Sequence, residues 1–174
     1  NQTAGQLELL SQLMDELERT ESRERYDLLL GKIVVIGTYL KRRKNLVLTQ
    51  YASDGNQLTM EDLRQSLAES CDSLKLCKIR AAYYIANGEV QLNADDILKC
   101  YDTFEWLAER LSDVMQSMFY RVSQIDDDLR ISVHIASEAD LCGLMSERPD
   151  LKVQQEDEKE WFVGCSIFRK RGGR

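Results

Sequence analysis

The chain has 174 residues, of which 43% are hydrophobic and 30% are charged, and its formal net charge is −7. This composition is typical of a folded protein with a buried core, and it excludes an intrinsically disordered chain. The negative charge argues against nucleic acid as a partner, because nucleic-acid-binding proteins neutralise many phosphates. The five cysteines have no metal-ligand spacing and mostly lie among apolar neighbours, which predicts reduced thiols and a cytoplasmic location.

Membrane contact is expected only through a region that would precede Asn1. No run approaches the roughly 18 apolar residues of a membrane span, and no signal peptide is visible. Because the chain starts without methionine, we expect a preceding segment, which could hold a sensor or a membrane anchor. Two basic clusters, at residues 41–44 and 169–171, are interpreted as a solvated helix end and a chain terminus. The alternative is contact with an acidic partner or a membrane surface.

Residues 3–50 are predicted to be helical, either as one rod or as two helices joined near Glu21 and Ser22. Apolar residues first recur at alternating steps of three and four, as in the seam of a coiled coil, at Leu7, Leu10, Met14 and Leu17. A wider apolar face follows, from Leu28 to Leu40, and it contains Gly31 and Gly37. A helix tolerates glycine where another backbone must come close.

A second helix is predicted over residues 59–77, after a turn at residues 53–56. Thr59 and Asp62 have the spacing of a capping box, so this helix would return antiparallel to the first. One small domain cannot cover the whole apolar face of such a hairpin. We therefore predict a parallel homodimer through residues 4–77, with the two hairpins forming a four-helix bundle.

From residue 79 the hydrophobic period changes from helical to two. A strand over residues 80–86 is closed by Asn87-Gly88, and Asn93 caps a helix. Further strands are predicted at 118–123, 129–135, 151–155 and 161–169, with a short irregular or helical piece at 138–145. The predicted fold is α+β, with helices on a mostly antiparallel sheet. It divides into a helical hairpin at 1–78 and a small α/β sandwich at 79–174.

A family resemblance rests on two segments of the first hairpin. Residues 25–31, Arg-Tyr-Asp-Leu-Leu-Leu-Gly, resemble the Arg-Ile-His-Asp-x-Leu-Gly signature of one branch of two-component sensor histidine kinases. Residues 37–46, Gly-Thr-Tyr-Leu-Lys-Arg-Arg-Lys-Asn-Leu, are similar to the following part of that helix in a clostridial-type subgroup. The later β-α-β-β order resembles the ATP-binding domain of the same superfamily, GHKL. The resemblance implies a response regulator or another kinase as partner.

The resemblance also shows which phosphotransfer residues are missing. It places Asp27 at the position of the phosphoacceptor histidine, and Leu28 at that of its acid–base carboxylate. An imidazole nitrogen is the nucleophile in these kinases, and no neighbouring side chain replaces it in kind. The only histidine, His134, alternates with the apolar positions of a predicted strand, so we interpret it as an ordinary residue of a sheet face.

The nucleotide-binding residues implied by the resemblance are also altered. Glu105 matches the glutamate of a Glu-x-x-x-Asn pattern that holds Mg²⁺–ATP, but Glu109 replaces the asparagine. Carboxylates at i and i+4 can hold a metal ion, yet they repel a triphosphate, so we expect a solvated helix face here. Residues 136–140 lack the glycines of the Asp-x-Gly-x-Gly turn, and the second glycine box and the lid are missing.

These departures predict a degenerate, catalytically inactive member of the family, with no catalytic residue and no cofactor. We expect a dimeric scaffold, or a docking partner for a response regulator or another kinase. One alternative is a divergent kinase that binds Mg²⁺–ATP at Glu105 and Glu109. The other is a relative of sporulation-type phosphotransferases, against which the missing histidine of the hairpin counts.

Overall fold

The structure, a computed structural model, describes residues 3–52, 58–86 and 92–168. The predicted turns at 53–56 and 87–88 and the basic cluster at 169–171 lie outside these residues. The helices are α1 (Ala4–Arg19), α2 (Arg23–Ala52), α3 (Met60–Leu74), the short 3₁₀ helix η1 (Lys75–Cys77), α4 (Ala94–Leu111) and α5 (Leu144–Glu147). The strands are β1 (Arg80–Ile85), β2 (Met115–Ile125), β3 (Asp128–Ser137), β4 (Lys152–Asp157) and β5 (Glu160–Ile167).

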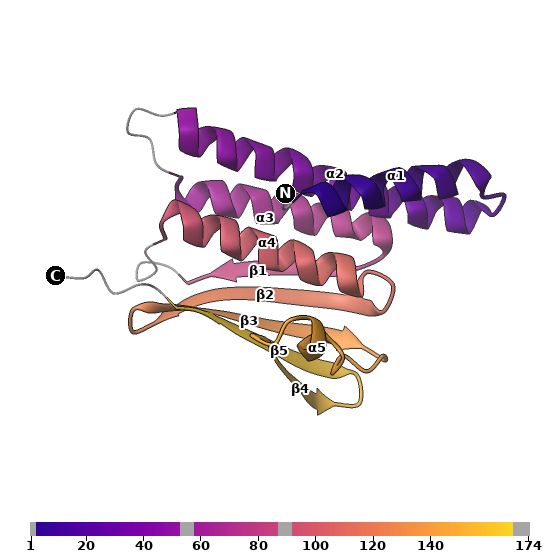
Figure 1. Ribbon diagram of the computed structural model, residues 1–174. Coiled ribbons are helices and arrows are strands. Elements are labelled where there is room, and N and C mark those ends of the chain that lie inside the picture. Colours follow the sequence, from indigo (N-terminus) through magenta and orange to yellow (C-terminus); the bar gives the residue numbers. More distant parts are fainter. Residues whose placement is uncertain (1–2, 53–57, 87–91, 169–174) are drawn as a thin grey trace.

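The strands form one sheet in the order β1-β2-β3-β5-β4. β1 pairs with β2 in parallel, and the other neighbours are antiparallel. α3 and α4 lie against one face of this sheet, and α1 and α2 form a further layer above them (Figure 1). The predicted α+β class and the predicted strands are therefore confirmed.

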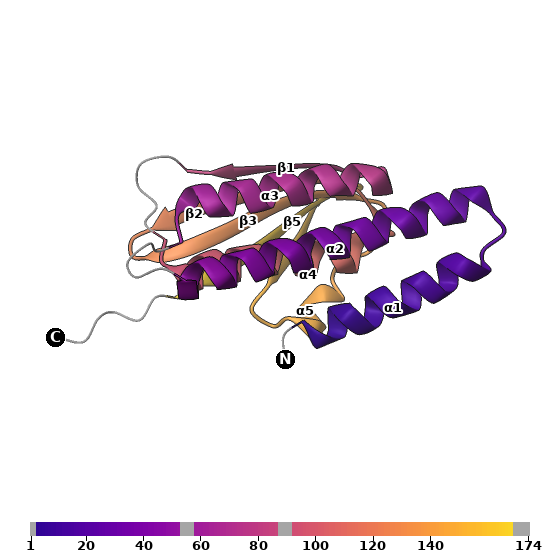
Figure 2. The same ribbon diagram turned by 90° about the horizontal axis from the view of Figure 1, so that it is seen from above.

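The first predicted helix is broken into two, and α1 folds back along α2 (Figure 2). Thr20 ends α1 in an extended conformation, with φ −81° and ψ 133°. The Ser22 hydroxyl then accepts a hydrogen bond of 3.3 Å from the backbone N–H of Arg25, as an N-terminal cap does. The break predicted near Glu21 and Ser22 is thus confirmed, and a continuous rod is wrong. α1 buries Leu13 against residues of α2.

The predicted capping box at Thr59 and Asp62 and the predicted cap at Asn93 are both present. The Thr59 hydroxyl accepts from the backbone N–H of Asp62, and the Asp62 carboxylate accepts from the backbone N–H of Thr59. Asn93 and Asp96 make the same reciprocal pair at the start of α4. These bonds satisfy N–H groups that a helix leaves free at its first turn, so they fix where α3 and α4 begin.

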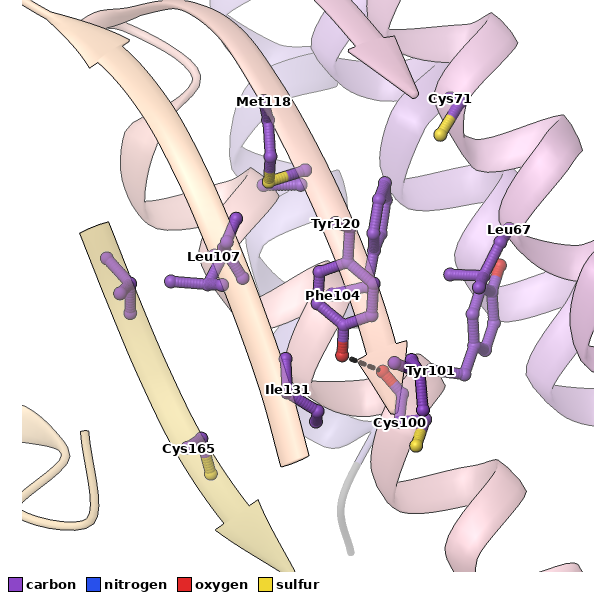
Figure 3. Packing of buried hydrophobic residues seen from close by; sticks show 14 of the residues in the cluster. Leu67, Cys71, Cys100, Tyr101, Phe104, Leu107, Met118, Tyr120, Ile131 and Cys165 are labelled. Atoms are coloured by element: carbon purple, nitrogen blue, oxygen red, sulfur yellow. Dashed lines mark hydrogen bonds between the residues drawn. The ribbon is translucent and has the colours of Figure 1, made fainter. Parts of the chain in front are cut away.

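One cluster of buried side chains runs from α2 through α3 and α4 to the sheet (Figure 3). Phe104 of α4 packs edge-to-face on Tyr120 of β2, with ring centroids 5.2 Å apart. The Tyr120 hydroxyl donates a 2.7 Å hydrogen bond to the carbonyl of Cys100. The predicted division at residue 78 stays a prediction, and this core is continuous across it.

The two glycines of α2 have different surroundings. A Cβ added to Gly31 would lie 2.8 Å from the carbonyl oxygen of Leu76, so α2 and η1 approach each other closely here. A Cβ added to Gly37 would meet no atom within 4 Å. The expected close approach of another backbone is confirmed at Gly31.

Candidate functional site

A cavity of about 590 Å³ lies where α1, α2 and α4 meet the end of β5. α4 lines it with one of its faces, because residues at i, i+3 and i+4 share one face of a helix. Asp102, Glu105 and Trp106 have this spacing. Gln6 of α1, Tyr39 of α2 and Arg148, which follows α5, also line the cavity. Four segments that are distant in the sequence therefore meet here.

Asp102 of α4 binds two side chains of α2, one of which carries a positive charge. It accepts a hydrogen bond of 2.8 Å from the Tyr39 hydroxyl and one of 3.0 Å from Nε of Arg43. Burial and the adjacent Asp102 raise the pKa of Tyr39, so its hydroxyl remains a donor at physiological pH. The negative charge of Asp102 is thus already paired with the Arg43 guanidinium.

Glu105 has no positively charged partner of this kind among the described residues. Its side chain belongs to a residue that is 1% exposed, and neither carboxylate oxygen has a hydrogen-bond partner. Burial raises the pKa of Glu105 well above its ordinary value, and the nearby Glu109 and Asp102 raise it further. Burial therefore favours the protonated, neutral form of Glu105. The prediction of a solvated helix face is wrong at this position, because α1 and α2 cover α4 here.

Glu109 continues the same row one turn later. Burial raises the pKa of Glu109, while contacts with Glu105, Gln6 and Arg110 lower it. The carboxyl groups of Glu105 and Glu109 are close enough to hydrogen bond when one of them carries a proton, and without a proton neither has a donor to offer. Among the described residues, the buried side-chain oxygens without a partner are Gln6 Oε1, both oxygens of Glu105, and Glu109 Oε1. All of them lie at this contact between α1 and α4.

Two arginines near the cavity are bound to other groups. Arg148 donates two hydrogen bonds, of 2.8 and 2.6 Å, to the carboxylate of Asp150. Hydrogen bonding to Arg148 lowers the pKa of Asp150 to about 2. The guanidinium groups of Arg148 and Arg110 lie 5.2 and 5.6 Å from the centre of the Trp106 ring. Arg110 also pairs with Glu147 at 2.7 Å.

The structure does not bring the other predicted positions to this cavity. Asp27 is exposed, as expected, with Leu29 buried beside it. A single helix over residues 3–50 would have placed Asp27 near its middle. Because α2 begins at Arg23, Asp27 instead lies in the second turn of a helix. His134 lies on the sheet face opposite the helices, with Nδ1 3.5 Å from the Glu156 carboxylate.

The residues at the nucleotide-equivalent positions do not fit Mg²⁺ bound to a triphosphate. Burial already disfavours the ionised forms of Glu105 and Glu109, and the negative charge of a triphosphate beside them would disfavour those forms further. The segment 136–140 is held by structural contacts: the Ser137 hydroxyl donates to the carbonyl of Val114, and the Trp161 indole donates to the carbonyl of Ser137. Among the described residues, no group of three His, Cys, Asp or Glu side chains is placed to hold a metal ion.

Sequence reasoning identified Glu105 but missed Gln6, Trp106 and Arg148. One signal was available, because Glu105 lies between Phe104 and Trp106 and four residues after Tyr101, within the apolar stripe of α4. A charged residue so close to a buried stripe is often functional or paired. Gln6 and Arg148 carry no comparable signal in the sequence. Gln6 reaches the cavity because α1 folds back along α2, and Arg148 reaches it through the segment that connects β3 to β4.

No family model and no curated protein matches the sequence. Solved structures with similarity include the histidine kinase AdeS of Acinetobacter baumannii, with 8% identity, a TM-score of 0.47 and coverage of 93% of this chain and 94% of that one. A bacterial phosphotransferase has 12% identity and a TM-score of 0.43, covering 94% and 88%. The histidine kinase ThkA in complex with the response regulator TrrA has 10% identity and a TM-score of 0.39, covering 92% and 57%. At these values the similarities establish neither the family nor the function of the chain.

None of the helices described here combines the length and the apolar character needed to cross a membrane.

Proposed function

We propose that this chain is a signalling protein of the histidine kinase type that has lost phosphotransfer and acts as a dimeric scaffold for a response regulator or a partner kinase. The burial of Glu105 beside Glu109 carries the proposal. These residues stand where the resemblance places Mg²⁺–ATP, and a triphosphate there would add negative charge to buried carboxyl groups. Asp27, at the phosphoacceptor position, cannot replace an imidazole nucleophile.

The helical layer supports the dimeric part of the proposal. α1 and α2 expose six large apolar side chains. Two of them, Leu48 and Tyr51, lie in the last two turns of α2. We call the other four the outer apolar residues: Leu7, Met14, Tyr26 and Leu30. Gly37 of α2 leaves open space for the backbone of another helix. A second copy packed on this layer would cover these residues, as the predicted dimer through residues 4–77 requires.

Calorimetric titration with Mg²⁺–ATP, with incubation in radiolabelled ATP, tests the loss of phosphotransfer. We expect no saturable heat and no labelled protein. Saturable binding that disappears in Glu105→Ala would instead support the divergent kinase. Light scattering at tens of micromolar protein tests the dimer, and a monomer there would contradict the scaffold.

A further inference from the structure

The face of the sheet opposite the helices is here called the open face. Successive residues of a strand point to opposite faces of a sheet. Tyr120 of β2 and Ile131 of β3 are buried in the core beneath the helices, so the residues next to them lie on the open face. α1 to α4 all lie on the other side of the sheet (Figure 1). The open face is defined here by Arg121, Arg130, Ser132, Lys152, Phe162 and Gly164.

One row across the open face has a cation at each end and two small residues between them. Arg121 of β2 lies opposite Ser132 of β3. Gly164 of β5 lies between Ser132 and Lys152 of β4. Neighbouring strands are about 4.8 Å apart, so the backbones of Arg121 and Lys152 are about 14 Å apart along this row. Serine and glycine project little from a sheet, so the two long cationic side chains rise on either side of them.

Arg130 adds a third cation beside this row. It lies two residues before Ser132 on β3, and its side chain points to the same face. Arg121, Arg130 and Lys152 are all exposed. Among the described residues, none of these three cations forms an ion pair with a carboxylate. Their positive charges are therefore available to an external anion.

Two carboxylates on this side of the molecule already have partners. Asp150 accepts hydrogen bonds of 2.8 and 2.6 Å from Arg148. Glu156 lies 3.5 Å from Nδ1 of His134. Neither of them neutralises the three cations of the open face.

A hollow of about 400 Å³ lies on the open face, and both Arg130 and Lys152 line it. Phe162 and Gly164 line the same hollow. A Cβ added to Gly164 would lie 3.0 Å from a ring carbon of Phe162, so the aromatic ring leans over the glycine. Phe168, which is 78% exposed, adds a second ring. The hollow therefore combines apolar surface with positive charge on two sides.

We propose that the open face binds an acidic segment of a partner protein, an extended stretch with a carboxylate at every second residue. Residues i, i+2 and i+4 of an extended chain point to one side and span about 14 Å. This span equals the separation of the two ends of the row. Three carboxylates of such a segment would pair with Arg121, Arg130 and Lys152, and their methylene groups would contact the Phe162 ring.

The charge of the whole chain favours a short acidic segment over a nucleic acid. The formal net charge is −7, so the cations of the open face are a local exception. Nucleic-acid binding depends on neutralising many phosphates, and a long strand would extend beyond the open face towards the acidic remainder of the protein. At physiological salt, charges more than about 8 Å away are largely screened, so three carboxylates would respond mainly to the three nearby cations.

Titration of the isotope-labelled chain with the peptide acetyl-Glu-Ser-Glu-Ser-Glu-amide, followed by the amide shifts in NMR spectra, tests the proposal. This measurement detects weak binding and also locates it. We expect saturable shifts at Arg121, Ser132 and Gly164 with a dissociation constant of about 1 mM at low salt, because exposed ion pairs are individually weak. The matched control is the same peptide with glutamine in place of glutamate, which should give no saturable shifts.

Substitutions of single cations test which charges bind the peptide. Lys152→Gln and Arg130→Gln should each weaken binding by about threefold, because each removes one exposed ion pair. Lys44→Gln removes the same charge from an exposed position of α2 and should leave binding unchanged. All three positions are exposed, so we expect the variants to fold, and the dispersion of their amide signals shows whether they do.

Three results would overturn the proposal: no saturable shifts with the acidic peptide, equal shifts with the glutamine peptide, or an equal loss of affinity in Lys44→Gln and Lys152→Gln. The last of these would show that net charge, and not the open face, determines binding. Tighter binding of a short single-stranded oligothymidylate than of the peptide would also overturn it, and would assign the open face to nucleic acid. The open face requires neither a second copy nor a nucleotide site, so failure here and failure of the scaffold function are distinguishable.

Discussion

The hydroxyl group of Tyr39 donates a 2.8 Å hydrogen bond to Asp102, and this bond joins α2 to α4 across 63 positions of sequence. The Tyr39 ring also lies 5.5 Å from that of Tyr101, so the same residue contributes to the core. Arg43 binds the same carboxylate. The contact between α2 and α4 therefore combines polar bonds to Asp102 with packing of the Tyr39 and Tyr101 rings.

Tyr39→Phe should lower the free energy of unfolding by about 1 kcal/mol, since it removes one hydrogen bond and keeps the ring. Arg43 would still bind Asp102, so the carboxylate would not be left unpaired. Urea denaturation followed by circular dichroism measures the change. Tyr26→Phe, at an exposed residue of the same helix, is the control and should change stability little. Equal effects of the two substitutions would show that the Tyr39 bond does not stabilise the fold.

Glu105→Gln should change how stability depends on pH. The pKa of Glu105 is raised in the folded protein, so the folded chain binds a proton that the unfolded chain has already lost. The free energy of unfolding of the wild type should therefore fall as pH rises from the ordinary glutamate range towards the folded value. The advantage of Glu105→Gln over the wild type should grow as pH rises above the ordinary glutamate range. Urea denaturation across this range measures it, and Glu8→Gln on the exposed face of α1 should show no such trend.

Gly31→Ala and Gly37→Ala should have opposite effects on the stability of the monomer. A methyl group at Gly31 would press on the carbonyl of Leu76, and we expect a loss of about 1–3 kcal/mol. At Gly37 there is open space, so alanine should stabilise the helix by about 1 kcal/mol. Thermal denaturation at low protein concentration compares the two variants. A stabilised Gly31→Ala would contradict the close approach of α2 and η1.

Leu30→Asp should weaken self-association without unfolding the protein. Leu30 is 42% exposed, and in a dimer its charge would enter an apolar contact. Sedimentation equilibrium would give a larger dissociation constant. Leu48→Asp is a matched control on α2, because Leu48 is exposed but is not one of the outer apolar residues. If both variants dissociate equally, the outer apolar residues are not the contact surface.

Asp27→His should leave stability within about 0.5 kcal/mol of the wild type, because the position is exposed. No phosphorylated protein should form from ATP, because the nucleotide-equivalent positions are a buried carboxyl pair. Mass spectrometry after incubation with Mg²⁺–ATP measures this. Phosphohistidine at position 27 would show that a working nucleotide site exists.

Local patterns predicted the elements well, because their causes lie within a few residues. The capping residues Thr59 and Asn93 marked the starts of α3 and α4, and the alternation from Leu129 to Ile135 marked β3. The candidate site was predicted only in part. Glu105 was singled out by its position in a motif, but its burial depends on the way α1 folds back, which the apolar spacing of α1 does not determine. Long-range packing of this kind has no signature in one sequence.

The close contact of Gly31 with Leu76 and the bond from Tyr39 to Asp102 are eight residues apart on α2. A helix attached at one point can roll about its axis, whereas attachment at two points about 12 Å apart sets its rotational phase. The direction in which Asp27 and Leu30 face is thereby set by contacts of α2 with η1 and α4. One residue inserted between Gly31 and Tyr39 would turn that end of the helix by about 100°, moving Asp27 away from its present outward direction.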